Sequence, residues 1–302
     1  METFIVNICK MFLEMGYKVV LLTNSIHESI TIPDCVKIEH IERFIWDNID
    51  VIRTRMQQVS STIRKHKIDL VFSQEYWQTV SLYDFLAANS TGCYFMMCFH
   101  NNPCFLFKER YGRTNFEYTF NCFKYFDKVI ALSREHVRLL EEFGVDATYI
   151  PNVVDSELIE VANQPRVGFN NEIAWIGRFC EQKNPIEAIR VFNETCKCNT
   201  NQKMKLDIIG SVESQKTYND AVKLVQDLGL TDKVVFYGEK TNQEVVQCMK
   251  RARVLLYTSK FDGYPYLIAE AMACGIPIVA FEQGDLELFK CCPSIIQCET
   301  SV

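Results

Sequence analysis

The chain has 302 residues, of which 48% are hydrophobic and 23% charged, with 12 glycines and 8 prolines. These proportions exclude a disordered or fibrous chain, and the length favours two folded domains over one. The 32 basic residues are outnumbered by 38 acidic ones, and no block of Lys and Arg stands out, so nucleic acid is excluded as an expected partner.

Short apolar segments alternate with longer amphipathic ones along the whole chain, which is typical of parallel βαβ units. The first half opens with a helix pattern over 3–15. Ser133 and Gly144 carry the start and stop signals of a helix over 134–143. Strands are predicted at 18–22, 36–39, 70–72, 93–99, 129–131 and 148–150, with helical periodicity in most of the gaps.

The second half repeats the alternation after a polar segment, 154–171, that has little periodicity and is the best linker candidate. The predicted domains are therefore 1–160 and 161–302. Strands are predicted at 173–176, 206–209, 234–237, 254–257 and 278–280, and helices at 185–195, 215–228, 242–250 and 266–273.

The predicted fold class is α/β, with two Rossmann-like domains facing a cleft, since open parallel sheets bind ligands beyond the carboxyl ends of their strands. Both ends are expected to be truncated. The first domain lacks the strand and glycine turn that normally precede its first helix, and 291–302 supplies no closing helix.

One group of candidate site residues lies between the strand at 173–176 and the following helix. Gly177 allows a tight turn, and Arg178 and Lys183, at the carboxyl end of a strand, can hold a diphosphate and neutralise its charge as it leaves. Taken alone, they are also compatible with two solvated loop cations.

A second group lies in the segment 261–277 (FDGYPYLIAEAMACGIP). Pro265 suits the first turn of a helix, so the amides of Gly263 and Tyr264 are expected to point at an anion. Asp262 lies just outside that turn and Glu270 one to two turns further on. The alternative is that Asp262 only caps the helix and Glu270 is merely exposed.

These motifs together resemble the retaining GT-B glycosyltransferases of family 4, which carry a G-R-x4-K element and an acidic pair separated by seven residues. The likeness extends to the segments 150–155 (IPNVVD), 206–210 (LDIIG) and 234–238 (VVFYG) and is strongest over 150–280. Val153 replaces the usual glycine of the first segment, and Asp262 stands where the family usually has Glu.

The resemblance implies a role for each matching residue. Arg178 and Lys183 bind the donor diphosphate and stabilise the departing nucleotide, Glu270 binds the ribose hydroxyls, and Asp262 contacts the donor sugar. The glycines Gly177, Gly210, Gly238 and Gly263 and the residue Tyr264 complete the expected donor site.

The first half contributes His100, which follows an apolar strand where the family places a histidine beside the transferred sugar. A structural role for His100 stays open, and Asn101 and Asn102 are candidates for the acceptor side. His66 and His136 are expected to be solvated on helix surfaces.

The implied reaction moves a sugar from a UDP- or GDP-sugar to a saccharide or lipid-linked acceptor with retention of configuration. Polysaccharide, lipopolysaccharide or glycoconjugate biosynthesis in bacteria is the expected setting. No cofactor or metal is expected, because the two cations and helix amides can stabilise the leaving diphosphate.

The cysteines give no indication of a metal site or of disulfides. The 14 cysteines show no zinc-type spacing and no signal peptide precedes them, so they are predicted to be reduced thiols in a cytoplasmic protein. The pairs Cys196 with Cys198 and Cys291 with Cys292 are interpreted as chance neighbours. The longest apolar run falls well short of a membrane span of about 18 residues, so membrane contact is expected to be peripheral at most.

Two other functions remain open from the sequence. A nucleotide-sugar 2-epimerase shares the double-Rossmann plan, although the R-x4-K element and acidic pair favour the transferase. A catalytically silent protein that binds a sugar nucleotide or a partner is favoured by the truncated ends and by Asp262.

Overall fold

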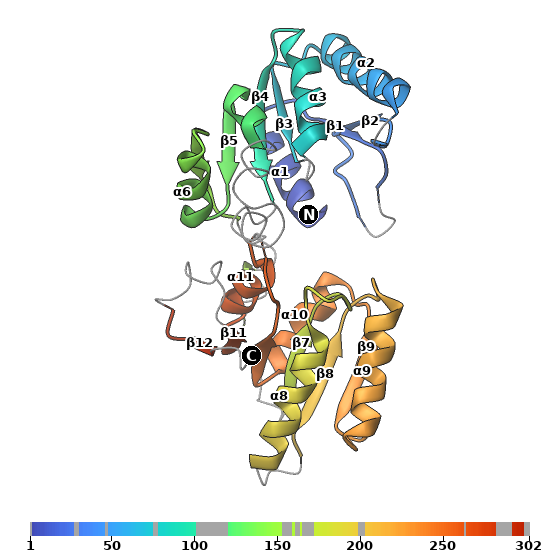
Figure 1. The fold of residues 1–302 in the computed structure, drawn as a ribbon, viewed down its shortest axis with the longest axis vertical. Coiled ribbons are helices and arrows are strands. Elements are labelled where there is room, and N and C mark those ends of the chain that lie inside the picture. Colours follow the sequence, from blue (N-terminus) through green and yellow to red (C-terminus); the bar gives the residue numbers. More distant parts are fainter. Residues whose placement is uncertain are drawn as a thin grey trace. The chain divides into compact units, whose positions relative to one another are not determined.

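The computed structural model describes residues 2–26, 30–45, 48–74, 78–100, 120–152, 159–160, 164, 172–198, 203–262, 264–281 and 292–298. The chain divides into two compact units, unit 1 (Met1–Asn152) and unit 2 (Val153–Val302) (Figure 1). Both contain parallel sheets with helices, which confirms the predicted α/β class. The predicted linker falls almost entirely outside the described residues, and the boundary at 160 stays a prediction.

Unit 2 is built around one six-stranded parallel sheet in the order β12-β11-β10-β7-β8-β9. Its first strand, β7, therefore lies in the middle, and the chain builds outward first on one side and then on the other. This is the doubly wound order. In chain order its elements are β7 (Glu172–Ile176), α8 (Pro185–Cys198), β8 (Lys205–Ile209), α9 (Gln215–Asp227), β9 (Val234–Gly238), α10 (Asn242–Arg251), β10 (Val254–Tyr257), α11 (Tyr266–Ala273), β11 (Ile278–Phe281) and β12 (Ile295–Cys298).

Two apolar clusters cover the two faces of this sheet, because successive strand residues point to opposite faces. Ala174 and Leu255 pack with α10 and α11 in one cluster. Their chain neighbours Trp175 and Leu256 pack with α8 and α9 in the other. Both faces are buried, which explains why these strands read as nearly continuous apolar runs in the sequence.

Unit 1 contains two separate parallel sheets. Strand β1 pairs with β2, and β3, β4, β5 and β6 form a four-stranded sheet in that order. In chain order its elements are α1 (Glu2–Glu14), β1 (Val20–Thr23), β2 (Lys37–His40), α2 (Ile49–His66), β3 (Leu70–Ser73), α3 (Gln78–Asn89), β4 (Tyr94–Phe99), η2 (Asn121–Tyr125), β5 (Lys128–Ala131), α6 (Arg134–Glu142) and β6 (Ala147–Tyr149).

The core of unit 1 is rich in aromatic side chains. Alternate residues of β4, among them Phe95 and Phe99, point into it and meet α2, α3 and η2. The Phe99 ring lies 5.3 Å from Phe120 and 5.5 Å from Phe123, in edge-to-face contact. This packing fixes the carboxyl end of β4, which His100 follows.

Two histidines differ from the prediction. His136 was expected to be solvated, but it is completely buried and lies in the first turn of α6, where its backbone N–H donates to the Ser133 hydroxyl at 3.1 Å. His66 is largely covered too, and its Nε2 lies 2.5 Å from a carboxylate oxygen of Glu39. Helix periodicity alone did not reveal which face each histidine occupies.

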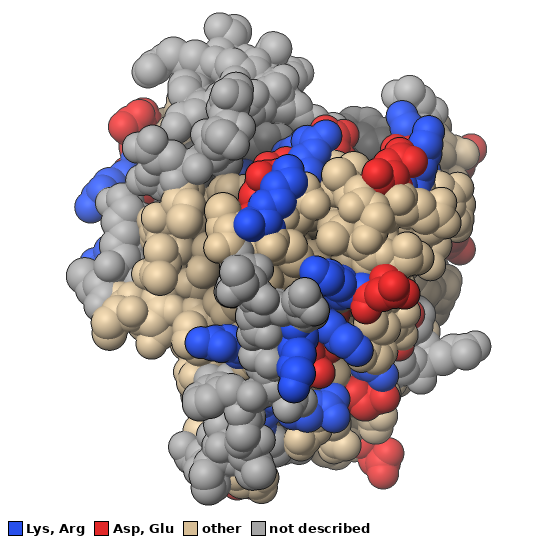
Figure 2. Space-filling model, turned by 90° about the horizontal axis from the view of Figure 1, so that it is seen from below, with Lys and Arg blue, Asp and Glu red and all other residues tan. Residues whose placement is uncertain are grey.

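Three features of the described residues concern possible partners: the surface charge, the length and hydrophobicity of the helices, and groups of metal-binding side chains. Basic and acidic side chains lie next to each other on the face shown in Figure 2. Within the described residues, no helix combines the length and apolar content needed to cross a bilayer. The same residues contain no group of three or more His, Cys, Asp or Glu side chains placed to hold a metal ion.

Candidate functional site

The loops that follow β7 and β10 are bound to each other at the place where the direction of strand order reverses. The Lys260 amide donates to the Gln182 carbonyl at 2.8 Å. The Thr258 hydroxyl lies 3.1 Å from the Lys183 carbonyl and 2.9 Å from that of Asn184. In doubly wound folds the ligand crevice forms at this switch point.

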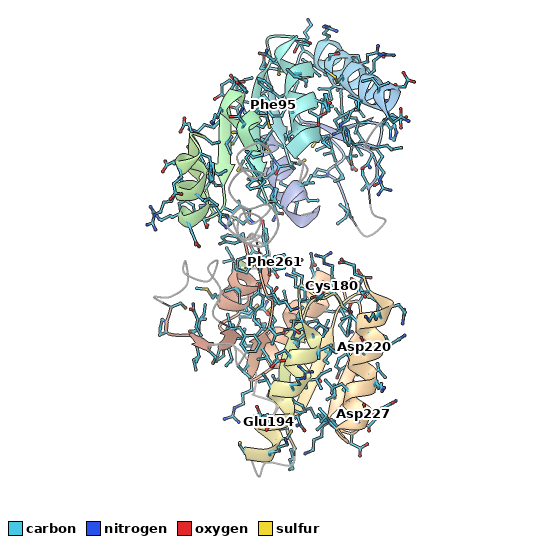
Figure 3. The ribbon with its side chains drawn as sticks, in the orientation of Figure 1. Phe95, Cys180, Glu194, Asp220, Asp227 and Phe261 are labelled. Carbon is cyan, nitrogen blue, oxygen red and sulfur yellow. The ribbon has the colours of Figure 1, made fainter. Side chains whose placement is uncertain are left out.

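Figure 3 shows at which end of unit 2 the loops after β7 and β10 lie. Cys180, in the loop after β7, and Phe261, in the loop after β10, lie at the same end of the unit. Glu194 in α8 and Asp227 at the end of α9 lie at the opposite end. The carboxyl ends of β7 and β10 therefore bring residues about 80 positions apart in sequence to one edge.

An ion pair joins the two loops. Lys183 Nζ lies 2.7 Å from each carboxylate oxygen of Asp262, and the two side chains are 20% and 12% exposed. The same carboxylate accepts hydrogen bonds from Gln182 Nε2 at 3.1 Å, from Ser259 Oγ at 3.0 Å and from the Tyr257 hydroxyl. Four donors on one carboxylate fix its position.

This arrangement bears on one alternative that the sequence left open, namely that Asp262 only caps the helix. Helix α11 begins at Tyr266 with Pro265 as its N-cap, and no side chain caps it. Asp262 is therefore not the capping residue. Its carboxylate is bound to Lys183, which the resemblance assigns to the same site.

The second predicted cation, Arg178, also meets a carboxylate. Its Nη1 donates to Glu213 Oε2, and the two side chains are 54% and 49% exposed. Arg178 lies in the loop after β7 and Glu213 in the loop after β8, so both belong to the same edge of the sheet. Arg178 is thus in an ion pair rather than solvated alone.

Two further predicted donor-site residues of unit 2, Gly210 and Gly238, lie at the carboxyl ends of neighbouring strands. The Gly210 amide donates to the Gly238 carbonyl at 2.9 Å. Glu270 is half-buried on α11, and Tyr264 precedes that helix. Gly263 lies outside the described residues.

His100 lies in unit 1 and is buried. Its Nε2 is 2.7 Å from Gln74 Oε1, and its ring makes an edge contact with Phe4 at 4.8 Å between centroids. Burial lowers the pKa of His100 to about 4, so its ring is neutral near pH 7. Asn101 and Asn102 lie outside the described residues.

Sequence reasoning missed the polar residues that hold these cations and carboxylates. Tyr257 ends the apolar strand β10, and Ser259 follows it. Polar residues at the carboxyl end of a central parallel strand are a usable signal for a site. Glu213 gave no such signal, because its partner lies 35 residues away.

Two family models match the chain. The Glycosyltransferase Family 4 model matches residues 1–158, more than half of the chain, and the Glycosyl transferases group 1 model matches residues 161–287. The second match contains the loops after β7, β8 and β10.

Curated relatives match over shorter stretches. Mannosylfructose-phosphate synthase of Agrobacterium fabrum is 25% identical over 197 residues, which cover 60% of this chain and 42% of that protein. Lipopolysaccharide 1,6-galactosyltransferase of Salmonella typhimurium is 39% identical over 69 residues, which cover 22% of this chain and 19% of that protein. The chain thus spans less than half the length of each of these relatives.

Solved structures match along the full chain. A glycosyltransferase from Rickettsia africae superposes with a TM-score of 0.78 at 14% identity, covering 100% of this chain and 81% of that one. Anabaena HepE, in complex with UDP and glucose, gives 0.73 at 18% identity, covering 99% and 82%. These likenesses show the fold. The family models place the chain among the glycosyltransferases that combine a Glycosyltransferase Family 4 half with a Glycosyl transferases group 1 half.

Proposed function

We propose that this protein is a retaining family 4 glycosyltransferase that moves a sugar from a nucleotide-diphosphate donor to an acceptor hydroxyl. The observation that carries the proposal is the Lys183–Asp262 ion pair at the switch point of unit 2, with Arg178 in the same loop after β7 as Lys183. Two cations and a firmly held carboxylate at this edge suit the two ends of a sugar diphosphate.

The chemical difficulty of the reaction is the negative charge that develops on the leaving diphosphate. Lys183 and Arg178 can neutralise it, and the positive ends of the helix dipoles at the starts of α8 and α11 add positive potential. We assign Glu270 to the ribose hydroxyls and Asp262, with the amides of Gly263 and Tyr264, to the hydroxyls of the sugar. In this arrangement no bound metal or cofactor is needed.

Retention follows if attack and departure share one face of the sugar. The bond between the anomeric carbon and the phosphate oxygen breaks while the acceptor oxygen bonds to the same carbon. The acceptor proton passes to the departing phosphate oxygen, so no protein base is required. We place His100 beside the transferred sugar, where its neutral ring serves as a hydrogen-bond partner rather than as a cation.

The relatives guide the choice of substrates. The HepE structure contains UDP and glucose, and the Salmonella relative is named for galactose transfer to lipopolysaccharide. We therefore propose a UDP-sugar ahead of a GDP-sugar, with a saccharide or lipid-linked acceptor in polysaccharide or glycoconjugate assembly. A lipid-linked acceptor brings the protein to the inner face of the membrane as a peripheral protein.

Calorimetric titration with UDP, GDP and their sugar conjugates tests the proposal. We expect saturable binding of one nucleotide, lost or weakened at least about tenfold in Lys183→Ala, because a charge-assisted contact to phosphate disappears. Lys197→Ala is the matched control, since Lys197 lies in the last turn of α8 and pairs with Glu194 in a surface ion pair.

The outcomes separate the possible functions. Binding that Lys183→Ala leaves unchanged would refute the site assignment. Binding without sugar transfer to any acceptor in a mixed saccharide and lipid-linked panel would support a silent sugar-nucleotide-binding protein instead.

A further inference from the structure

The loop after β8 is fixed against the loop after β7 by backbone contacts. The Phe179 amide donates to the Ser211 carbonyl at 2.9 Å, and the Ser214 amide donates back to the Phe179 carbonyl at 2.8 Å. Ser214 is also the N-cap of α9, with its hydroxyl accepting from the Thr217 amide. Glu213, one of the two residues between these anchors, is therefore held beside the loop that carries Arg178.

Gly210 makes this close approach possible. Its φ is +153°, and a Cβ built there would lie 1.9 Å from the Gly177 carbonyl oxygen. The Gly177 amide donates to the Ile209 carbonyl at 2.9 Å, so the two chains stay in contact from the strand ends outward. The meeting of Arg178 and Glu213 is a result of backbone packing and not only of two flexible side chains.

Each of the two cations of the proposed donor site thus forms an ion pair with a carboxylate in this structure. Asp262, the partner of Lys183, belongs to the proposed sugar-binding residues. Glu213, the partner of Arg178, has no role in the reaction described above. Its carboxylate offers Arg178 the kind of oxygen that a phosphate offers, because guanidinium groups bind carboxylate and phosphate in similar geometry.

We propose that Glu213 determines the affinity for the donor: it holds Arg178 while the site is empty and gives it up to the diphosphate when the donor binds. The inference rests on the proposed function. Binding must then break the Arg178–Glu213 ion pair, and the free energy of that pair is subtracted from the free energy of phosphate binding. No covalent bond changes in this exchange.

The test is the affinity for UDP, measured by calorimetry, in Glu213→Gln. The variant keeps the shape of the side chain and removes its charge. Since both partners are about half exposed, we expect binding to tighten by about two- to fivefold. In an Arg178→Ala background the same substitution is expected to change nothing, because the competing pair no longer exists.

Glu239→Gln is the matched control for the loss of one negative charge. Glu239 follows β9 at the same edge of the sheet but belongs to a different loop. Its substitution is expected to leave UDP affinity within experimental error. Equal tightening in both variants would show a general charge effect and overturn the proposal.

The results also distinguish this inference from the proposed function. If the wild type binds UDP and Glu213→Gln binds it equally or more weakly, the proposed competition between Glu213 and the diphosphate for Arg178 is wrong. The proposed donor site would not be contradicted by this result. If neither protein binds any nucleotide diphosphate, both proposals fail. Binding that appears only in Glu213→Gln would support both.

Discussion

Asp262 shows how the length of one side chain determines what a site residue does. The resemblance places a Glu at this position, and Asp is shorter by one methylene. In the structure the shorter side chain keeps its carboxylate within reach of Lys183, Ser259 and Tyr257, close to the strand ends. We therefore expect this residue to influence the choice of sugar through how far it extends toward the sugar hydroxyls.

His100 provides a prediction about pH. Burial lowers its pKa from 6.5 to about 4, so between these values the unfolded chain takes up a proton that the folded chain does not. The free energy of unfolding is thus expected to fall as pH drops through this window. The loss attributable to His100 is about 3 kcal/mol at most.

Urea unfolding followed at several pH values across this window measures the effect. His100→Gln should make the free energy of unfolding less dependent on pH, whatever its absolute stability. His40→Gln is the control, because His40 is exposed at the end of β2. A pH dependence equally steep in wild type and His100→Gln would contradict a neutral buried His100.

At the scale of elements, α2 and α3 are joined by a buried ion pair. Arg55 Nε and Nη2 donate to the two carboxylate oxygens of Asp84 at 2.9 and 2.7 Å, and Nη1 donates to the Glu42 carbonyl at 3.0 Å. The two side chains are 9% and 10% exposed. Burial of such a pair costs desolvation free energy. Removal of both partners is therefore expected to change the free energy of unfolding less than removal of one partner.

We expect Asp84→Ala to lower the free energy of unfolding by about 3–5 kcal/mol, because it removes the carboxylate that balances the buried charge of Arg55. The double variant Arg55→Met with Asp84→Leu should cost less than this single one. Arg53→Ala is the control: its pair with Asp50 lies on the same helix in solvent and should contribute less than about 1 kcal/mol. Urea unfolding checks all of these, and a double variant less stable than Asp84→Ala would be the contrary result.

Periodicity predicted most elements to within a few residues because their apolar faces are buried against one core. Strand β4 is an example, since its residues at 95, 97 and 99 all face the core. The short strand β12 was not predicted. Its residues are only partly buried, and it exists through pairing with β11, in which Ile278 faces Ile295. A pairing between distant segments leaves no local pattern.

The difference between a local pattern and a contact between distant segments also applies to the candidate site. The spacing from Arg178 to Lys183 lies within one loop, and that from Asp262 to Glu270 within one loop and the helix that follows it, so the sequence displays both. The contacts of Lys183 with Asp262 and of Arg178 with Glu213 depend on strand order, which alone brings the loops together. The residues alone display two motifs, the resemblance assigns both to one donor site, and the contacts that hold them depend on the sheet.

The whole molecule consists of two compact units with separate cores. We expect Phe95→Ala to destabilise unit 1 and Leu206→Ala to destabilise unit 2, by about 2–5 kcal/mol each, since both side chains are fully buried. Hydrogen exchange should then speed up only in the unit that carries the substitution. Each variant is the control for the other, and loss of protection in both units from either substitution would show that they unfold together.

The division of the sheets in unit 1 has a consequence for association in solution. Among the described strands, unit 2 presents two sheet edges, β12 and β9, whereas the two sheets of unit 1 present four, at β1, β2, β3 and β6. A strand edge offers N–H and C=O groups to any extended segment that reaches it. Self-association through strand pairing is therefore expected to begin at unit 1.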